Sequence, residues 1–209
     1  MSSVSTYAFA TLTLLIACLT ACSTNPPMSE VAQPSDATKP DPEKSHVARI
    51  ERYSAGDSEY AGFYNNFEFK ATILNSNIRN ALLERQGSYY QWDSEKRQLE
   101  LEKSNKEAAA EIVVFMSFFT PERRNDNLTD LNSIWRIYLE AGGRRYQAKI
   151  KRTRTLLAEL QVLFPYHTRW NTPYYLSFPV PTTAIETQES TLTVTGPLGT
   201  RTIKFAPVQ

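Results

Sequence analysis

A pair of glycines near the middle of the chain places the strongest constraint on the fold. Gly142-Gly143 lies between two segments in which apolar residues alternate, 133–141 and 144–152. Glycine readily adopts the positive φ that a two-residue hairpin turn requires, so the pair predicts an antiparallel hairpin. Pairing Ala141 with Arg144 then puts the apolar residues of both strands on one face: Leu139 with Tyr146, Ile137 with Ala148 and Trp135 with Ile150.

The same register predicts a basic face on the other side of this hairpin. Arg136 lies opposite Lys149 there, and Arg145 and Lys151 share the face with them. Such a face could contact anionic lipid headgroups, lipopolysaccharide or an acidic partner. The alternative is a solvated outer strand face, in which lysines protect a sheet edge against aggregation.

Further strands are expected on both sides of the hairpin. Apolar residues alternate between Tyr60 and Leu74, and the continuous apolar run 112–119 is typical of a strand that is covered on both faces. Other segments with strand-like patterns are 156–164, 174–178, 191–195 and 200–205, the last two joined through 196–199. The number and spacing of these segments favour a mainly β domain.

Two helices are expected after the first strand. Residues 75–77 can cap a helix over 77–86 that ends at Gly87, and Asp93 or Ser94 can cap a second helix over about 94–109. We therefore predict an antiparallel, immunoglobulin-like β-sandwich with a helical insertion at about 77–109, after its first strand.

The first 21 residues are typical of an export signal. They contain no charged side chain, and 7–19 is almost entirely apolar or small. This run is too short for a bilayer-spanning helix of about 20 apolar residues, which favours a signal peptide. The segment ends in Leu19-Thr20-Ala21-Cys22, and this sequence resembles the lipobox of bacterial lipoproteins.

The resemblance to lipoproteins implies how and where the chain is attached. The signal peptide, 1–21, would be cleaved before Cys22, the sulfur of Cys22 would carry a diacylglycerol thioether, and the new amino group would be acylated, for example with palmitate. Through Ser23, the resemblance also implies the periplasmic face of the outer membrane. Leu15-Ile16-Ala17-Cys18 matches the same pattern, but a polar stretch follows Cys22 and Leu19 follows Cys18, which favours Cys22. The remaining alternatives are an uncleaved N-terminal helix and a signal removed by the ordinary peptidase.

Composition changes again after the lipobox. Residues 22–58 are rich in Pro, Ser, Thr, Asp and Lys and contain few large apolar residues, so we expect a lipidated, disordered tether. Residues 59–209 are then expected to form one sandwich domain. Segments 118–121, 133–136 and 163–165 resemble uncharacterised bacterial lipoproteins with a sandwich domain. That resemblance implies no known activity and no catalytic residues.

Two loops are candidate binding sites. The loop between Pro165 and Pro173 contains Tyr166, His167, Arg169 and Trp170, with Tyr174 and Tyr175 directly after it. Exposed aromatic residues beside arginine suit glycan stacking or a protein hot spot, although such residues more often close the end of a sandwich core. The acidic loop 125–132 offers oxygen ligands for Ca²⁺ but lacks the glycine and terminal glutamate of an EF-hand, so we predict no metal and no cofactor.

Charge and motifs narrow the class of function. The 23 Lys and Arg residues and 22 Asp and Glu residues give a net charge of +1, which removes the usual electrostatic argument for nucleic-acid binding. The sequence has no nucleophile elbow, HExxH, phosphate loop or dinucleotide fingerprint. We therefore predict a membrane-anchored, non-enzymatic binding or scaffolding module of the cell envelope, with an envelope protein or anionic glycolipid as partner. The alternative is an envelope hydrolase that acts on a glycan or peptide.

Overall fold

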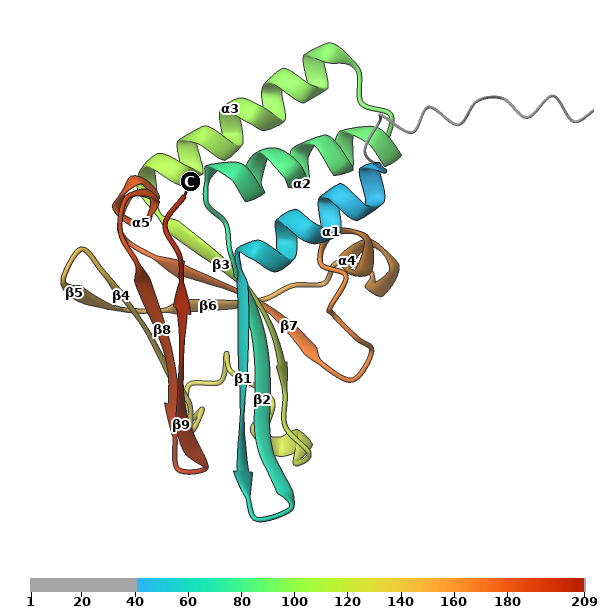
Figure 1. Cartoon of the computed structure of the whole chain (residues 1–209). Helices are drawn as coiled ribbons and strands as arrows, with labels where there is room; N and C mark the ends of the chain where they lie inside the picture. Colours follow the sequence, from blue (N-terminus) through green and yellow to red (C-terminus); the bar gives the residue numbers. More distant parts are fainter. Residues whose placement is uncertain (1–40, 209) are drawn as a thin grey trace, which may run out of the picture. The chain divides into compact units, whose positions relative to one another are not determined.

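The computed structural model describes residues 41–208 (Figure 1). The predictions for the signal peptide, for Cys22 and for the tether up to residue 40 lie outside the described residues. The first half of the described chain comprises α1 (Pro42–Arg52), β1 (Ser54–Ala61), β2 (Tyr64–Ile73), α2 (Ser76–Tyr89), α3 (Ser94–Ala110), β3 (Ile112–Phe119) and the short 3₁₀ helix η1 (Arg123–Asn125). The second half comprises β4 (Arg136–Ala141), β5 (Arg144–Gln147), β6 (Lys149–Arg152), α4 (Leu157–Leu163), β7 (Thr172–Phe178), α5 (Thr183–Glu186), β8 (Ser190–Gly196) and β9 (Gly199–Phe205).

The strands form two antiparallel sheets, so the predicted mainly β, antiparallel fold is confirmed at this level. One sheet has five strands in the order β1-β2-β3-β7-β6, and the other has four in the order β5-β4-β8-β9. The α2 and α3 helices lie between β2 and β3 in the chain. Within residues 41–208, none of the helices combines the length and the hydropathy needed to cross a membrane.

The Gly142-Gly143 turn forms with the predicted register, but the second strand of the hairpin is divided between the two sheets. Both glycines have positive φ, and Leu139 pairs with Tyr146. After Ala148 the chain leaves β4, and β6 pairs with β7 of the five-stranded sheet instead. The predicted pair of Trp135 with Ile150 is therefore wrong, because alternation alone does not specify which sheet a strand joins.

One hydrophobic cluster contains residues of both sheets. Alternate residues of β2, from Phe67 to Ile73, are buried on the face that also carries Met116 and Phe118 of β3. The same cluster includes Ile137 and Leu139 of β4 and Leu192 and Val194 of β8. The period-two pattern read from the sequence thus identified one side of this core from Phe67 onward. Its start was wrong, because 60–63 is the end of β1 and the turn to β2, where Phe63 is fully exposed. The two helices therefore follow the second strand rather than the first.

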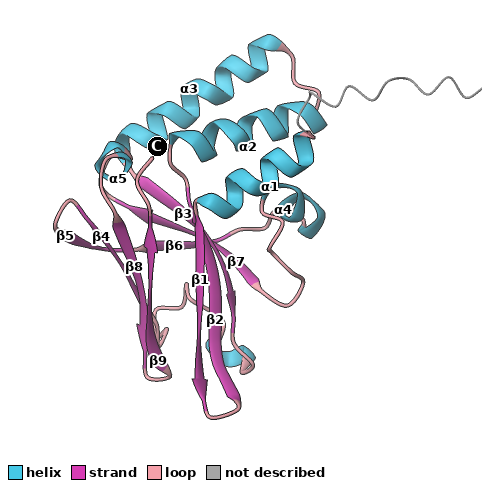
Figure 2. Ribbon diagram, in the orientation of Figure 1, coloured by secondary structure: helices cyan, strands magenta, loops and turns pink. Residues whose placement is uncertain are grey.

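Helices cover the opposite face of the five-stranded sheet. Figure 2 shows α1, α2 and α3 grouped together at one side of the strands. Phe115 of β3 stacks on Phe164, which follows α4, with ring centroids 3.8 Å apart. The prediction that 112–119 is a strand covered on both faces is confirmed, since seven of its eight residues are buried.

The predicted helix starts are confirmed, and one predicted end is wrong. Asn75 caps α2 by accepting a hydrogen bond from the Ile78 amide, and Asp93 caps α3 in the same way through Lys96. However, α2 continues through Gly87, where an added Cβ would lie 3.1 Å from the Arg97 guanidinium. Gly87 therefore allows close helix packing and does not end the helix.

The prediction of a strand at 156–164 is also wrong. This segment forms α4 rather than a strand, with Leu160 and Leu163 buried at the three-residue spacing of a helix face. The short apolar run fits either structure, and packing against the sheet selects the helix.

The prediction of a disordered tether is wrong for its described part, 41–58, because this part is folded. Asp41 caps α1 and Pro42 occupies the first helical turn, a position where proline is favoured. Ile50 of α1 is buried, and β1 pairs with β2 from Ser54 onward. The folded domain thus begins by Pro42 rather than at residue 59. The composition that suggested disorder also contains the start signals of this helix.

Candidate functional site

A cleft of about 540 Å³ lies where α2 and α3 meet the β6–β7 edge of the five-stranded sheet. We call it the α2–α3 cleft. Its apolar lining consists of Leu74, Leu82, Leu83, Val113, Leu163 and Tyr175. Its polar lining consists of Arg79, Gln86, Glu100, Lys103, Ser104, Glu107, Glu111, Lys149, Lys151 and Ser177. A volume of this size is typical of small-molecule sites.

The strand register places two lysines in the cleft. Lys149 pairs with Ser177 and Lys151 with Tyr175, and directly paired residues of neighbouring strands share a face. That face is the one that the helices cover. Neither lysine forms an ion pair with any residue from 41 to 208. Both charges thus remain available to a ligand.

Arg79 is the most buried charged side chain in the cleft, with 6% of its surface exposed. Its Nε donates to the Leu74 carbonyl at 3.0 Å, and its Nη1 contacts the Glu107 carboxylate at 2.5 Å. Its Nη2 is buried and has no hydrogen-bond partner among the described residues. Leaving a buried donor unpaired costs about 1–3 kcal/mol, so an acceptor oxygen from a ligand would stabilise this group.

The cleft has a small excess of positive charge. Four cationic side chains line it against three carboxylates. Arg79 is paired with Glu107, and Lys103 with Glu100 at 3.7 Å. Burial, followed by Glu159 and Glu107, raises the pKa of Tyr175 to about 12. The Tyr175 hydroxyl therefore stays protonated at neutral pH and can donate a hydrogen bond.

The predicted basic face is wrong as a single surface, because its four cations belong to two sheets. Arg145 is on β5 and pairs with Glu140 at 2.6 Å. Arg136 is on β4 and donates to the carbonyls of Ser133 and Trp135. Lys149 and Lys151 are on β6, in the other sheet. The division of the strand after Ala148 separates them.

The two halves of the aromatic loop between Pro165 and Pro173 differ in exposure. His167 is 2% exposed, and Tyr166, half-buried, exchanges a hydrogen bond with Thr72 at 2.7 Å. Trp170 is 63% exposed and Arg169 is exposed. Only the second half of the predicted binding surface therefore faces solvent, and it lies outside the α2–α3 cleft.

A serine and a histidine meet in the core near this loop. The Ser117 hydroxyl lies 2.8 Å from Nδ1 of His167. No carboxylate among residues 41–208 contacts the ring, and burial is the sole cause that lowers the His167 pKa.

In the acidic loop, the Asp126 carboxylate accepts a hydrogen bond from Thr172 and pairs with Arg123. The described residues contain no group of three or more His, Cys, Asp or Glu side chains suited to a metal.

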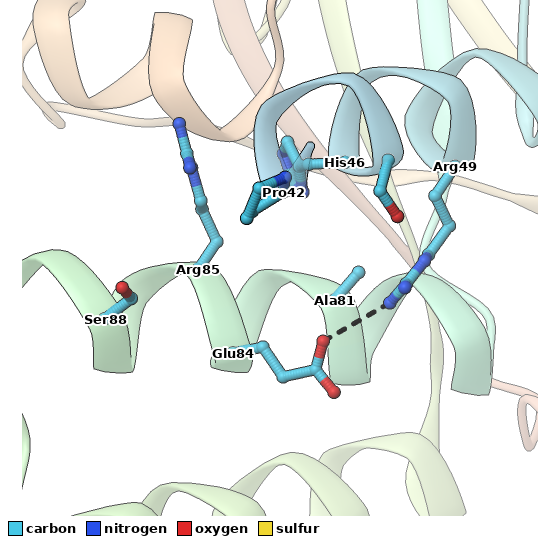
Figure 3. A pocket seen from close by; sticks show the side chains of 8 residues that line it. Pro42, His46, Arg49, Ala81, Glu84, Arg85 and Ser88 are labelled. Carbon is cyan, nitrogen blue, oxygen red and sulfur yellow. Dashed lines mark hydrogen bonds and ion pairs between the residues drawn. The ribbon is translucent and has the colours of Figure 1, made fainter. Parts of the chain in front are cut away.

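A smaller hollow of about 210 Å³ lies between α1 and α2 (Figure 3). Arg49 of α1 pairs there with Glu84 of α2 at 3.4 Å, and Arg85 pairs with Glu43. His46 is buried, with Nε2 3.0 Å from the Leu163 carbonyl. Because these polar groups contact one another or the backbone, they hold α1 on the domain.

The two histidines make the stability of the domain depend on pH. His46 and His167 are the only histidines in the chain, and burial lowers the pKa of each below 6.5. The unfolded chain therefore binds more protons than the folded one below about pH 6.5. We expect the free energy of unfolding to be constant above pH 7 and to fall as the pH decreases from 6.5 to 5.5, as measured by urea denaturation. A His46→Gln/His167→Gln variant should lose this slope, and an unchanged slope would show that other groups cause it.

The residue that most distinguishes the cleft has no signal in the sequence. Arg79 is a single arginine in an amphipathic helix, and its burial results from packing of α2 on α3 and β3. Lys149 and Lys151 were identified as cations from the sequence, but the surroundings predicted for them were wrong.

No protein-family model matches the chain, and neither a curated protein nor a solved structure matches it.

Proposed function

We propose that this chain is a lipid-anchored protein of the bacterial envelope whose folded domain binds another envelope component in the α2–α3 cleft, without converting it. The anchor would be the lipid on Cys22, on the periplasmic face of the outer membrane. The lipobox ending at Cys22 and the following Ser23 support this location. Each buried methylene of the lipid would contribute about 0.8 kcal/mol to anchoring.

One observation carries the binding role: Lys149 and Lys151 line one cleft beside Arg79 and form no ion pair within residues 41–208, and the buried Nη2 of Arg79 has no hydrogen-bond partner there. Lys149 and Lys151 are exposed and need no partner within the domain, whereas the buried Arg79 does need one for each of its donors. Two unpaired lysines gathered beside such a buried, incompletely paired arginine favour recognition of a ligand that brings acceptors.

The composition of the cleft favours binding over hydrolysis. Its lining contains neither histidine nor cysteine, and the serines there, Ser104 and Ser177, have no histidine beside them. The Ser117–His167 contact lies in the core and has no carboxylate to orient the imidazole. A hydrolase that uses two carboxylates would need both of them free, whereas Glu107 in this cleft pairs with Arg79, and Glu100 pairs with Lys96 and Lys103.

We also propose that the two sheets form an immunoglobulin-like sandwich in which α2 and α3 are an insertion. The shared hydrophobic cluster supports sandwich packing. In such a fold the insertion would supply the cleft, and the sandwich would hold it rigidly.

Intact mass spectrometry of the full chain, extracted in mild detergent from the envelope of a Gram-negative host, tests both parts of this function. We expect a chain that lacks 1–21 and carries a lipid, and an uncleaved, unlipidated Cys22→Ala variant. Lipid that persists in this variant and disappears with Cys18→Ala would move the anchor to Cys18. An unlipidated wild-type chain would contradict the anchor altogether.

The same spectra, recorded under native conditions, report the bound component. We expect an additional mass that is lost in Lys149→Gln/Lys151→Gln. The matched control is Arg144→Gln/Arg154→Gln, which changes the charge equally at two exposed cations outside the cleft and should retain the mass. A mass held equally by both variants, or no mass in the wild type, would contradict binding in the cleft.

A further inference from the structure

The lining of the α2–α3 cleft indicates the chemical class of its ligand. Building on the proposed binding function, we propose that the cleft takes a monoanionic amphiphile: a single carboxylate carried by an apolar chain. The argument has three parts, which concern the fixed donor, the charge balance and the apolar lining.

The fixed donor is Arg79. Its guanidinium is held by the Leu74 carbonyl and the Glu107 carboxylate, so Nη2 stays in place without a partner. A carboxylate offers two oxygens, one for an ammonium group of the β6 lysines and one for Nη2 once the side chains that bury Nη2 move aside. Hydrogen bonds between ionised partners are about twice as strong as neutral ones, which favours a charged acceptor.

The charge balance limits the ligand to one negative charge. Four cations against three carboxylates leave one positive charge in the lining. A carboxylate neutralises that excess, whereas a phosphate monoester carries about 1.5–2 negative charges at pH 7 and would add repulsion from Glu107 and Glu111.

The apolar lining requires more of the ligand than an anionic group. Leu82 and Leu83 on α2 are half-buried and face the cleft together with the buried Val113 and Leu163. An apolar chain would cover these side chains. Each methylene that it buries should strengthen binding about fourfold.

Calorimetry on the lipidated full chain in phosphatidylcholine nanodiscs tests this class at pH 8, with empty discs subtracted. The probes are octanoate, hexanoate, acetate and octanamide. We expect octanoate to bind about 15-fold tighter than hexanoate, because two methylenes are lost. Acetate and octanamide should bind at least tenfold more weakly than octanoate. Equal binding of octanamide would overturn the need for the charge, and equal binding of acetate would overturn the need for the chain.

Variants place the binding in the cleft. Lys149→Gln/Lys151→Gln should weaken octanoate at least about fivefold and leave octanamide unchanged, whereas Arg144→Gln/Arg154→Gln should change neither. Arg79→Lys keeps the charge but removes Nη2, so it should also weaken octanoate binding. If Arg79→Lys does not fold, the result for Lys149→Gln/Lys151→Gln decides whether octanoate binds in the cleft. If octanoate does not bind while the envelope-derived mass still depends on the lysines, the ligand class is wrong and the binding function stands. If octanoate does not bind and no lysine-dependent mass is found, both the ligand class and the binding function are wrong.

Discussion

A protein that begins at residue 59 is expected to remain unfolded, whereas one that begins at residue 41 is expected to fold. The shorter protein lacks α1 and the first five residues of β1, and with them Ile50 and Tyr53, which are 0% and 3% exposed. Replacing one buried aliphatic residue by alanine costs about 2–5 kcal/mol, and a whole domain has only about 5–15 kcal/mol of stability. Loss of a core helix and an edge strand together should therefore exceed what the domain can tolerate.

Circular dichroism and urea denaturation of the two truncated proteins would measure this difference. The longer protein should unfold in one cooperative transition, and the shorter one should show none. Within the longer protein, Ile50→Ala should lower the free energy of unfolding by about 2–5 kcal/mol, while the exposed neighbour Ala48→Ser should change it by less than about 0.5 kcal/mol. A cooperative transition in the protein that begins at 59 would show that α1 is dispensable.

Local signals explain the elements that the sequence predicted correctly. The caps Asn75 and Asp93, the turn Gly142-Gly143 and the apolar run of β3 each act within a few residues. In each case the tertiary structure agrees with the local preference, so pattern and propensity are sufficient.

Long-range pairing explains the errors. The alternation in 144–152 continues through Ala148, yet the strand partner changes from β4 to β7, which is far along the chain. For the same reason the cleft was not predicted: it needs Arg79 of α2 beside lysines some 70 residues later, and their separation in sequence gives no sign of it. The helix α1 was missed because polar composition outweighed its cap and its two buried positions.

Trp135→Ala is expected to destabilise the domain by about 3–5 kcal/mol, since Trp135 links the two sheets. The residue precedes β4 of one sheet, and its ring meets Phe67 and Phe118 of the other edge-on, at centroid distances of 4.7 and 5.4 Å. Its Nε1 donates to the Asn125 carbonyl at 2.8 Å. Trp135→Phe keeps most of the apolar contact but loses this hydrogen bond, so it should cost less than Trp135→Ala when both are measured by urea denaturation.

Gly196 provides an independent test of this packing. A Cβ added at Gly196 would lie 2.7 Å from the Trp135 ring, so Gly196→Ala should destabilise the wild-type domain. In the Trp135→Ala background the ring is absent, and the cost of Gly196→Ala should shrink to the part caused by the Ile134 carbonyl, 2.9 Å from the same Cβ. Residues in direct contact are coupled by about 0.5–3 kcal/mol, whereas distant ones are additive. Additive costs for Trp135→Ala and Gly196→Ala would therefore show that the indole does not pack over β8.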